Sequence, residues 1–206
     1  VRELIDHSYQ EGFDVLAITN HDQVTYDDYL ADYAKERGIL LIPGVEATIS
    51  KKHILLLNVD YSLHRIRTFD DLKLLKDGSG LVIAPHPFFP SFTSLNSKLQ
   101  ENLVIFDALE YSHCYLEKIN FNKKAEDLAK EFSLPLIGTS DAHSLWQIGT
   151  TYSLIEAEKK LESVIAAIKE GKVEIVTEPL STRRLCSIVS MLLSHMVRRG
   201  NFCKRE

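Results

Sequence analysis

The sequence predicts an α/β fold in which helices cover a parallel sheet that closes like a barrel. Short apolar segments alternate with amphipathic ones along most of the 206 residues, which is typical of parallel strands joined by helices. Polar residues follow several apolar segments directly, at the point where a buried strand would end. Six or seven strand–helix units in about 180 residues favour barrel-like closure over an open sheet.

The expected elements follow from length and periodicity. Strands are short, continuous apolar runs, and helices are longer segments with apolar residues every three or four positions. Two of the helices are expected to end at Gly38 and Gly78, since glycine favours the backbone conformation that ends a helix. The expected strands are residues 14–19, 39–44, 53–59, 80–85, 105–111, 134–140 and 172–177. The expected helices are residues 2–11, 26–38, 69–78, 117–132 and 157–171.

Charge divides the chain into a body and a tail. The net charge is −5, which argues against a general nucleic-acid binder. Residues 180–206 hold six basic residues and one acidic residue, a net charge of +5, so the remainder carries −10. We therefore expect one domain over residues 1–178 and a basic helical tail over 179–206, with a break at Pro179.

The tail contains an apolar segment, residues 185–197, with arginine pairs on both sides. It is shorter than the roughly 20 residues that span a bilayer, so no membrane span is predicted. A helix that packs back on the domain is the preferred interpretation, and an interfacial membrane or oligomer helix is the alternative. The oligomeric state is not predicted.

The cysteines and the first residues bear on location and completeness. Cys114, Cys186 and Cys203 are widely spaced and form no CxxC pair, which favours a reducing cytoplasm. No signal peptide is visible. The chain begins at Val1 inside a helical pattern, and we expect that residues preceding it in the natural protein are missing.

Metal-binding residue types cluster at the expected strand ends. They are Asn20, His21 and Asp22 after the first strand, Glu46 after the second, His86 after LVIAP, and Asp141 and His143 after LIGTS. The carboxyl ends of parallel strands meet at one edge of a sheet, so these side chains should converge. Imidazoles and carboxylates together bind Zn, Mn or Fe. His53 departs from the pattern because it begins its strand.

Each residue alone has a simpler interpretation. His21 suits a turn, Glu46 an exposed surface, His86 a loop before proline, and Asp141 a helix cap. Taken together, independent turns have no reason to place such residues at the same edge of one sheet. His113 is expected to form local bonds, with a supporting or substrate-binding role as the alternative. The remaining histidines are expected to have no function, namely His7, His64 and His195.

Five segments together resemble the motifs of the polymerase and histidinol phosphatase (PHP) family: AITNHD, IPGVEAT, HILLLNVD, IAPHP and GTSDAHSLWQIG. Their order and spacing are similar to the family's over roughly residues 3–177. The small stand-alone phosphoesterases of the family resemble the chain more than the polymerase-linked domains do.

The resemblance implies a distorted (β/α)7 barrel of the TIM type that holds up to three divalent metals at the strand ends. It implies that Glu46 bridges two metals, and that His53 and His86 complete one of these sites. Asp141 would bind the other of these two metals, and His21 and His143 would bind a third. Asn20, Asp22 and His113 are candidates for supporting or substrate-binding roles.

Two departures from the family pattern matter. The His-x-His pair of the family's first strand is absent, and its place would be upstream of Val1. Asn20 stands where relatives usually have aspartate. The sequence therefore predicts a metal-dependent phosphoesterase that lacks its first strand here, with a small phosphorylated substrate such as a nucleotide or sugar phosphate. A short oligonucleotide is the second candidate substrate, because the negative net charge of the chain does not favour binding of nucleic acid. The alternative is a degenerate PHP scaffold that binds metal or a partner without turnover.

Overall fold

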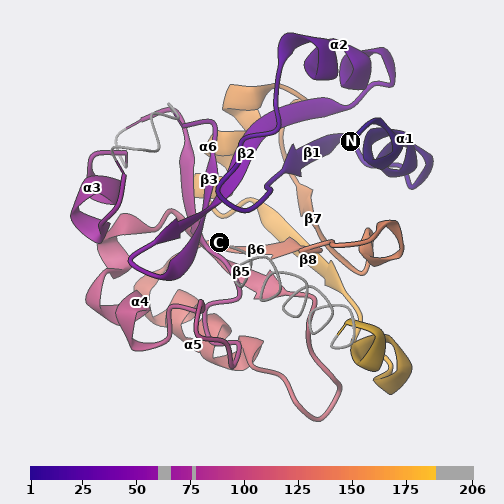
Figure 1. Cartoon of the computed structure of the whole chain (residues 1–206). Coiled ribbons are helices and arrows are strands. Elements are labelled where there is room, and N and C mark those ends of the chain that lie inside the picture. Colours follow the sequence, from indigo (N-terminus) through magenta and orange to yellow (C-terminus); the bar gives the residue numbers. More distant parts are fainter. Residues whose placement is uncertain (60–65, 76–77, 189–206) are drawn as a thin grey trace, which may run out of the picture.

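The computed structural model describes residues 1–59, 66–75 and 78–188, in which strands and helices alternate (Figure 1). The strands are β1 (Val15–Ile18), β2 (Leu40–Ile49), β3 (Lys52–Leu57), β4 (Leu81–Ala84), β5 (Ala108–Ser112), β6 (Leu136–Thr139), β7 (Thr151–Ile155) and β8 (Val173–Thr177). The helices are α1 (Arg2–Gln10), α2 (Asp28–Glu36), α3 (Phe69–Lys73), α4 (Ser97–Glu101), α5 (Asn122–Phe132) and α6 (Leu161–Lys169), with short 3-10 turns at Leu103–Ile105 and Leu145–Gln147.

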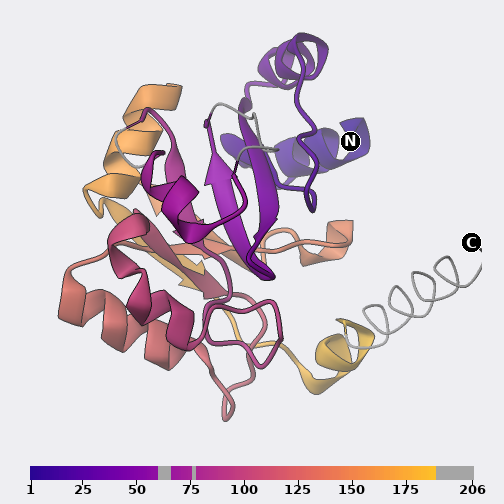
Figure 2. The same cartoon turned by 60° about the vertical axis from the view of Figure 1, so that its left-hand side comes forward.

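The sheet is curled and has the order β1-β2-β3-β4-β5-β6 (Figures 1 and 2). Strands β1 and β2 are parallel, and so are β4, β5 and β6. Strands β7 and β8 form a separate antiparallel pair that lies against β6. Within the described residues, the hydrogen-bonded order does not return from β6 to β1. The α/β class is confirmed, and the described strands make a half-barrel.

The expectation of a wholly parallel sheet is wrong at β3, which is antiparallel to both β2 and β4. Only two residues, Ser50 and Lys51, connect β2 to β3, and their φ angles are 49° and 65°. Two consecutive positive φ angles fit the type I′ turn that joins antiparallel strands. Strand β2 also continues beyond the predicted end at residue 44, so Glu46 lies within the strand.

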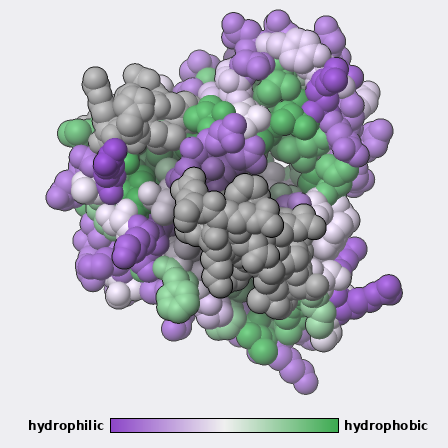
Figure 3. Space-filling view, viewed as in Figure 1, coloured by the Kyte–Doolittle hydropathy of each residue, from purple (hydrophilic) through white to green (hydrophobic). Residues whose placement is uncertain are grey.

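The core occupies both faces of the sheet, as continuous apolar strands require. Ile54 and Leu56 of β3 pack in one cluster, which helix α5 covers, while Leu55 and Leu57 face a second cluster under α6. A third cluster joins α1, α2 and β1. In the space-filling view, hydrophobic residues remain visible below α2 on this side of the molecule (Figure 3).

Strand β7 was not predicted, and it contacts β6 closely at Gly138. A Cβ at this position would lie 2.8 Å from the Tyr152 carbonyl oxygen and 2.8 Å from a methyl of Ile175. The Ser153 hydroxyl also accepts the Gly138 N–H at 2.9 Å and donates to the Gly138 carbonyl at 3.0 Å. The β7–β8 pair therefore sits against the strand that leads to Asp141.

Replacing Gly138 by alanine is expected to lower the free energy of unfolding by about 1–3 kcal/mol, because the backbone of β7 has to move away from the added methyl. Urea denaturation of the variant beside the unmodified chain measures this change. An unchanged midpoint would show that β7 does not approach β6 as closely as the structure has it.

The tail is described only in part. Residues 182–188 are helical. Residues 189–206, including His195 and Cys203, lie outside the described residues, as does His64, so the helical tail over 179–206 stays a prediction. Cys114 and Cys186 are free thiols. In the part of the chain that the structure describes, every helix is too short or too polar to traverse a bilayer.

Candidate metal centre

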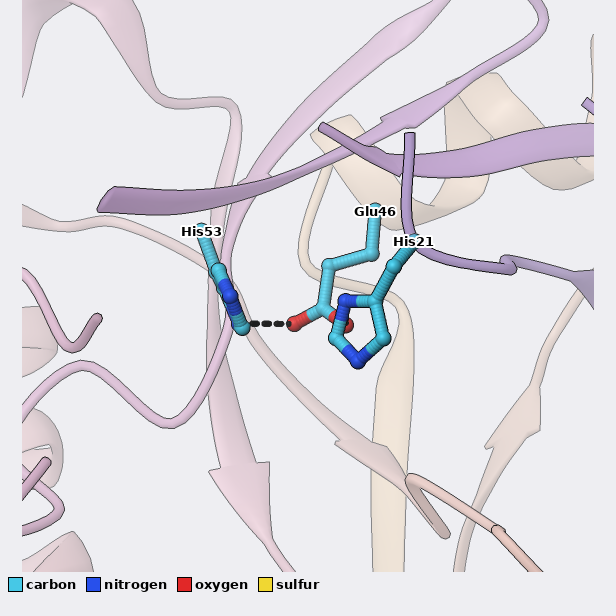
Figure 4. Close-up of side chains that lie close together, drawn as sticks. All are labelled: His21, Glu46 and His53. Carbon is cyan, nitrogen blue, oxygen red and sulfur yellow. Dashed lines mark ion pairs between the residues drawn. The ribbon is translucent and has the colours of Figure 1, made fainter. Parts of the chain in front are cut away.

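The Glu46 carboxylate lies at the centre of three imidazoles. Its Oε2 is 3.0 Å from His21 Nδ1, and its Oε1 is 2.9 Å from His53 Nδ1 and 3.2 Å from His86 Nε2. Glu46 is 5% exposed, so the carboxylate is removed from solvent. Figure 4 shows the His21 and His53 rings directed toward it from opposite sides. The structure thus brings together four of the six residues predicted to bind metal.

Backbone pairing holds His21 beside Glu46. The chain leaving β1 continues along β2, so that the Glu46 N–H donates to the Asn20 carbonyl and the Asp22 N–H donates to the Glu46 carbonyl. Asp22, at φ 52°, accepts from both the N–H and the hydroxyl of Thr48. Its carboxylate therefore fastens the loop to β2, which makes Asp22 a support for His21.

Asn20 has a similar local role. Its side-chain amide donates to the Thr25 hydroxyl at 2.7 Å, within the same loop. The side chains of Asn20 and Asp22 thus shape the loop that carries His21.

The antiparallel direction of β3 explains the placement of His53. Because β3 runs opposite to its neighbours, its first residues lie at the edge where β1, β4 and β6 end. His53 pairs with Thr48, two residues beyond Glu46, so His53 and Glu46 are diagonal neighbours on one face of the hairpin. The residue that departed from the sequence pattern therefore joins the same group.

His86 is oriented from both sides. Its Nδ1 lies 3.1 Å from the Ser94 hydroxyl, and its Nε2 faces Glu46. Ser94 is fully buried in the loop after β4, and the His53 N–H donates to the carbonyl of the adjacent Thr93. A hydrogen-bond partner on one ring nitrogen, which leaves the other nitrogen for the metal, is typical of metal-binding histidines.

Burial and the neighbouring charges set the protonation of this group. Burial tends to raise the pKa of Glu46, but hydrogen bonding by His21, His53 and His86 outweighs it and holds that pKa far below its usual range. Burial tends to lower the pKa of His86, but Glu46, Glu110 and Asp141 together raise it to about 9. Without a cation, the site keeps a proton on His86 near neutral pH.

Asp141 and His143 lie beside this group. Asp141 is close enough to interact electrostatically with Glu46, His86 and His21. The ring of His143 is 6.2 Å from that of His21, and its Nδ1 is 3.0 Å from the Asp141 carbonyl oxygen and 3.9 Å from the Asp141 carboxylate. Both therefore reach the same edge as the other four residues, with His143 toward solvent.

His113 does not form the local bonds expected of it. It is 2% exposed, its Nδ1 has no hydrogen-bond partner among the described residues, and its Nε2 is 3.5 Å from the side-chain nitrogen of the distant Gln147. Burial, with His143 and His86 nearby, lowers its pKa to about 4. Gln147 also accepts the His143 N–H, so it connects the two histidines.

Glu110 is a buried residue that the sequence analysis missed. It lies on β5 and is 1% exposed, and burial raises its pKa to about 7. The available signal was a second carboxylate, after Asp107, inside the otherwise apolar run IFDALEY. Such an interruption in a strand buried on both faces calls for a specific partner.

The residues around Glu46 fit a divalent cation. One ligand atom from each of His21, Glu46 and His53 lies within 4.8 Å of the others. His53 Nδ1 is buried and lies 2.9 Å from Glu46 Oε1. A buried nitrogen of this kind is suited to a metal, and nitrogen–oxygen donor sets bind Zn, Mn or Fe.

Comparisons with known proteins agree with these motifs. Residues 120–173 match the model of a family described as PHP-associated. The uncharacterised protein MJ1587 of Methanocaldococcus jannaschii is 23% identical over 136 residues, which are 63% of this chain and 78% of that protein.

Two solved structures share the fold. PsfC from Pseudomonas syringae aligns with a TM-score of 0.64 at 17% identity, over 97% of this chain and 88% of that one. A "putative metal-dependent phosphoesterase" from Bifidobacterium adolescentis aligns with a TM-score of 0.57 at 15% identity, over 69% of this chain and 82% of that one. The match over residues 120–173, the shared fold and the motifs at the strand ends all agree with the resemblance to the PHP family.

Proposed function

We propose that the protein is a metal-dependent phosphoesterase acting on a small phosphorylated substrate, such as a nucleotide or sugar phosphate, or on a short oligonucleotide. The observation that carries the proposal is the buried Glu46 carboxylate with imidazoles on both of its oxygens. The phosphoesterase name of a structural relative supports it. The net charge of −5 favours a small substrate over a long nucleic acid.

In this proposal His21, Glu46, His53 and His86 hold a divalent cation, and Asp141 and His143 hold others, up to three of Mn, Zn or Fe. A bound cation would supply Lewis acidity, which polarises a phosphoryl oxygen and lowers the pKa of water. We also propose that the half-barrel is part of the distorted (β/α)7 barrel of the family. The cytoplasmic location stays a prediction from the cysteine pattern.

The chain's own residues have distinct tasks. Asp22 and Ser94 hold His21 and His86 in place through the contacts described above. The His143 ring is 28% exposed and uses Nδ1 toward the Asp141 backbone, so its Nε2 is the nitrogen that would face a cation. His113 and Gln147 support His143 from the buried side.

The test measures metal content and hydrolysis on the same preparation. The protein is incubated with Mn²⁺, Zn²⁺ or Fe²⁺, desalted, analysed for bound metal, and assayed on p-nitrophenyl phosphate and bis-p-nitrophenyl phosphate. We expect turnover that depends on the divalent cation and disappears in Asp141→Asn. The matched control, Asp127→Asn, changes an exposed carboxylate on α5 and should keep full activity.

One observation favours the alternative of a scaffold without turnover: none of the eight histidines forms a His-x-His pair. A preparation that binds metal through Glu46 but hydrolyses neither ester would exclude the enzyme and support the scaffold. Turnover that persists in Asp141→Asn would exclude the assigned site.

A further inference from the structure

Glu110 connects two of the strands that carry the candidate ligands. It lies at the middle of β5, between β4, which ends before His86, and β6, which leads to Asp141. Its Oε2 accepts the backbone N–H of His86, and its Oε1 accepts the hydroxyl of Thr139 at the end of β6. One carboxylate therefore spans the ends of three adjacent strands.

Both of these chain segments take an unfavourable backbone conformation near the bonds to Glu110. His86 has φ 30° and Asp141, two residues after Thr139, has φ 42°. Positive φ is uncommon for residues other than glycine, and Pro87 restricts the conformation of His86 further. Such conformations persist only where the surroundings hold them, and they concentrate at functional sites.

The orientation of the His86 ring depends on this backbone. From its position, Nε2 reaches Glu46 at 3.2 Å while Nδ1 reaches Ser94 at 3.1 Å. The two contacts involve opposite nitrogens of the same ring, so a rotation of the backbone at His86 would move the ring and break at least one of them. The buried carboxylate is thus placed to fix the conformation that directs His86 at Glu46.

We propose that Glu110 is a positioning residue of the metal centre, which holds the strained backbone of His86 and the end of β6 so that His86 and Asp141 address one site. The metal-binding purpose of this residue rests on the proposed function, and its positioning role rests on the hydrogen bonds to His86 and Thr139. Glu110 itself points its oxygens at these donors and is not assigned as a ligand.

A matched pair of variants separates positioning from stability. Glu110→Gln keeps the shape but removes the negative charge and leaves a single acceptor oxygen. The Thr139 hydroxyl can turn to accept from the new amide N–H, so the change falls on the His86 N–H, whose acceptor becomes a neutral amide oxygen. Asp107→Asn makes the same chemical change just before β5, where Asp107 Oδ2 accepts the Val82 N–H at 2.8 Å. Asp107 ties β5 to the interior of β4 and does not bond to His86 or Thr139.

Two measurements test the pair. Titration with Co²⁺, followed by its visible spectrum, reports the affinity and geometry of the site, and ¹⁵N NMR of the metal-free protein reports the His86 ring. We expect Glu110→Gln to weaken Co²⁺ binding about 10–100-fold, to alter its spectrum and to shift the His86 ring resonances. Asp107→Asn should leave all three unchanged while lowering thermal stability.

The outcomes also distinguish this inference from the proposed function. Unshifted His86 resonances in Glu110→Gln, or equal shifts in both variants, would overturn the positioning role whether or not the protein hydrolyses esters. Shifted resonances with weakened Co²⁺ binding in a protein that lacks turnover would sustain the positioning role and exclude only the phosphoesterase.

Discussion

Replacing Glu46 by glutamine is expected to abolish retention of divalent cations and to reduce phosphoester hydrolysis by more than about a hundredfold. Groups that only orient metal ligands contribute about 10–100-fold, and Glu46 contacts three imidazoles directly. The amide is neutral, so the negative charge that favours a cation is lost while the shape stays the same. Elemental analysis and the p-nitrophenyl phosphate assay measure the two effects.

Circular dichroism of the Glu46→Gln protein is expected to match the unmodified chain, because the substitution is isosteric. Glu174→Gln, at an exposed position on β8, is the control and should retain both metal and activity. Retention of a full complement of metal by Glu46→Gln would remove Glu46 from the centre of the site and with it the proposed arrangement.

Acid is expected to destabilise the metal-free protein through His113. Its pKa in the folded chain is about 4, against an ordinary value of 6.5, because burial and the nearby His143 and His86 disfavour the charged ring. Below pH 6.5 the His113 ring binds a proton in the unfolded chain, whereas in the folded chain it stays neutral until the pH approaches 4. The stability is therefore complete above pH 6.5 and falls as the pH approaches 4, by about 3 kcal/mol from this residue.

Urea denaturation at intervals between pH 7 and pH 4, with a chelator present, measures this loss. Glu110 and Asp141 also titrate differently in the folded chain, so the comparison is with His113→Gln under the same conditions. The variant should show a shallower decline by the amount assigned to His113. Parallel curves for the two proteins would mean that His113 is protonated in the folded state.

Sequence reasoning predicted that these residues converge because His21, His86 and Asp141 follow strand ends, and strand ends converge for geometric reasons. Glu46 reaches the same edge from within β2. His21, His86, Asp141 and Glu46 all reached the expected edge. His53 could be placed only after the direction of β3 was known, since a strand's direction is set by its partners. The short Ser50–Lys51 connection is the local signal, but neither residue is typical of a type I′ turn.

The supporting residues were harder to foresee. Glu110 acts through contacts with segments far apart in the chain, Ser94 acts across a loop, and both side-chain types are common in other roles. Strand β7 lacks the continuous apolar run of the other strands. In the fold, its Ser153 bonds to Gly138 and its Leu154 is half exposed. In each case a partner elsewhere in the fold decides the structure, and the local sequence does not contain that information.

The β2–β3 hairpin has a consequence for how this protein tolerates changes in length. Side chains alternate between faces along a strand, so Glu46 and His53 share a face only because their separation and the two-residue turn fix the pairing. One residue added to or removed from that turn would transfer His53 to the opposite side of the sheet, into the core. A change of length in that turn is therefore expected to dismantle the group around Glu46, and the hairpin acts as a fixed spacer between Glu46 and His53.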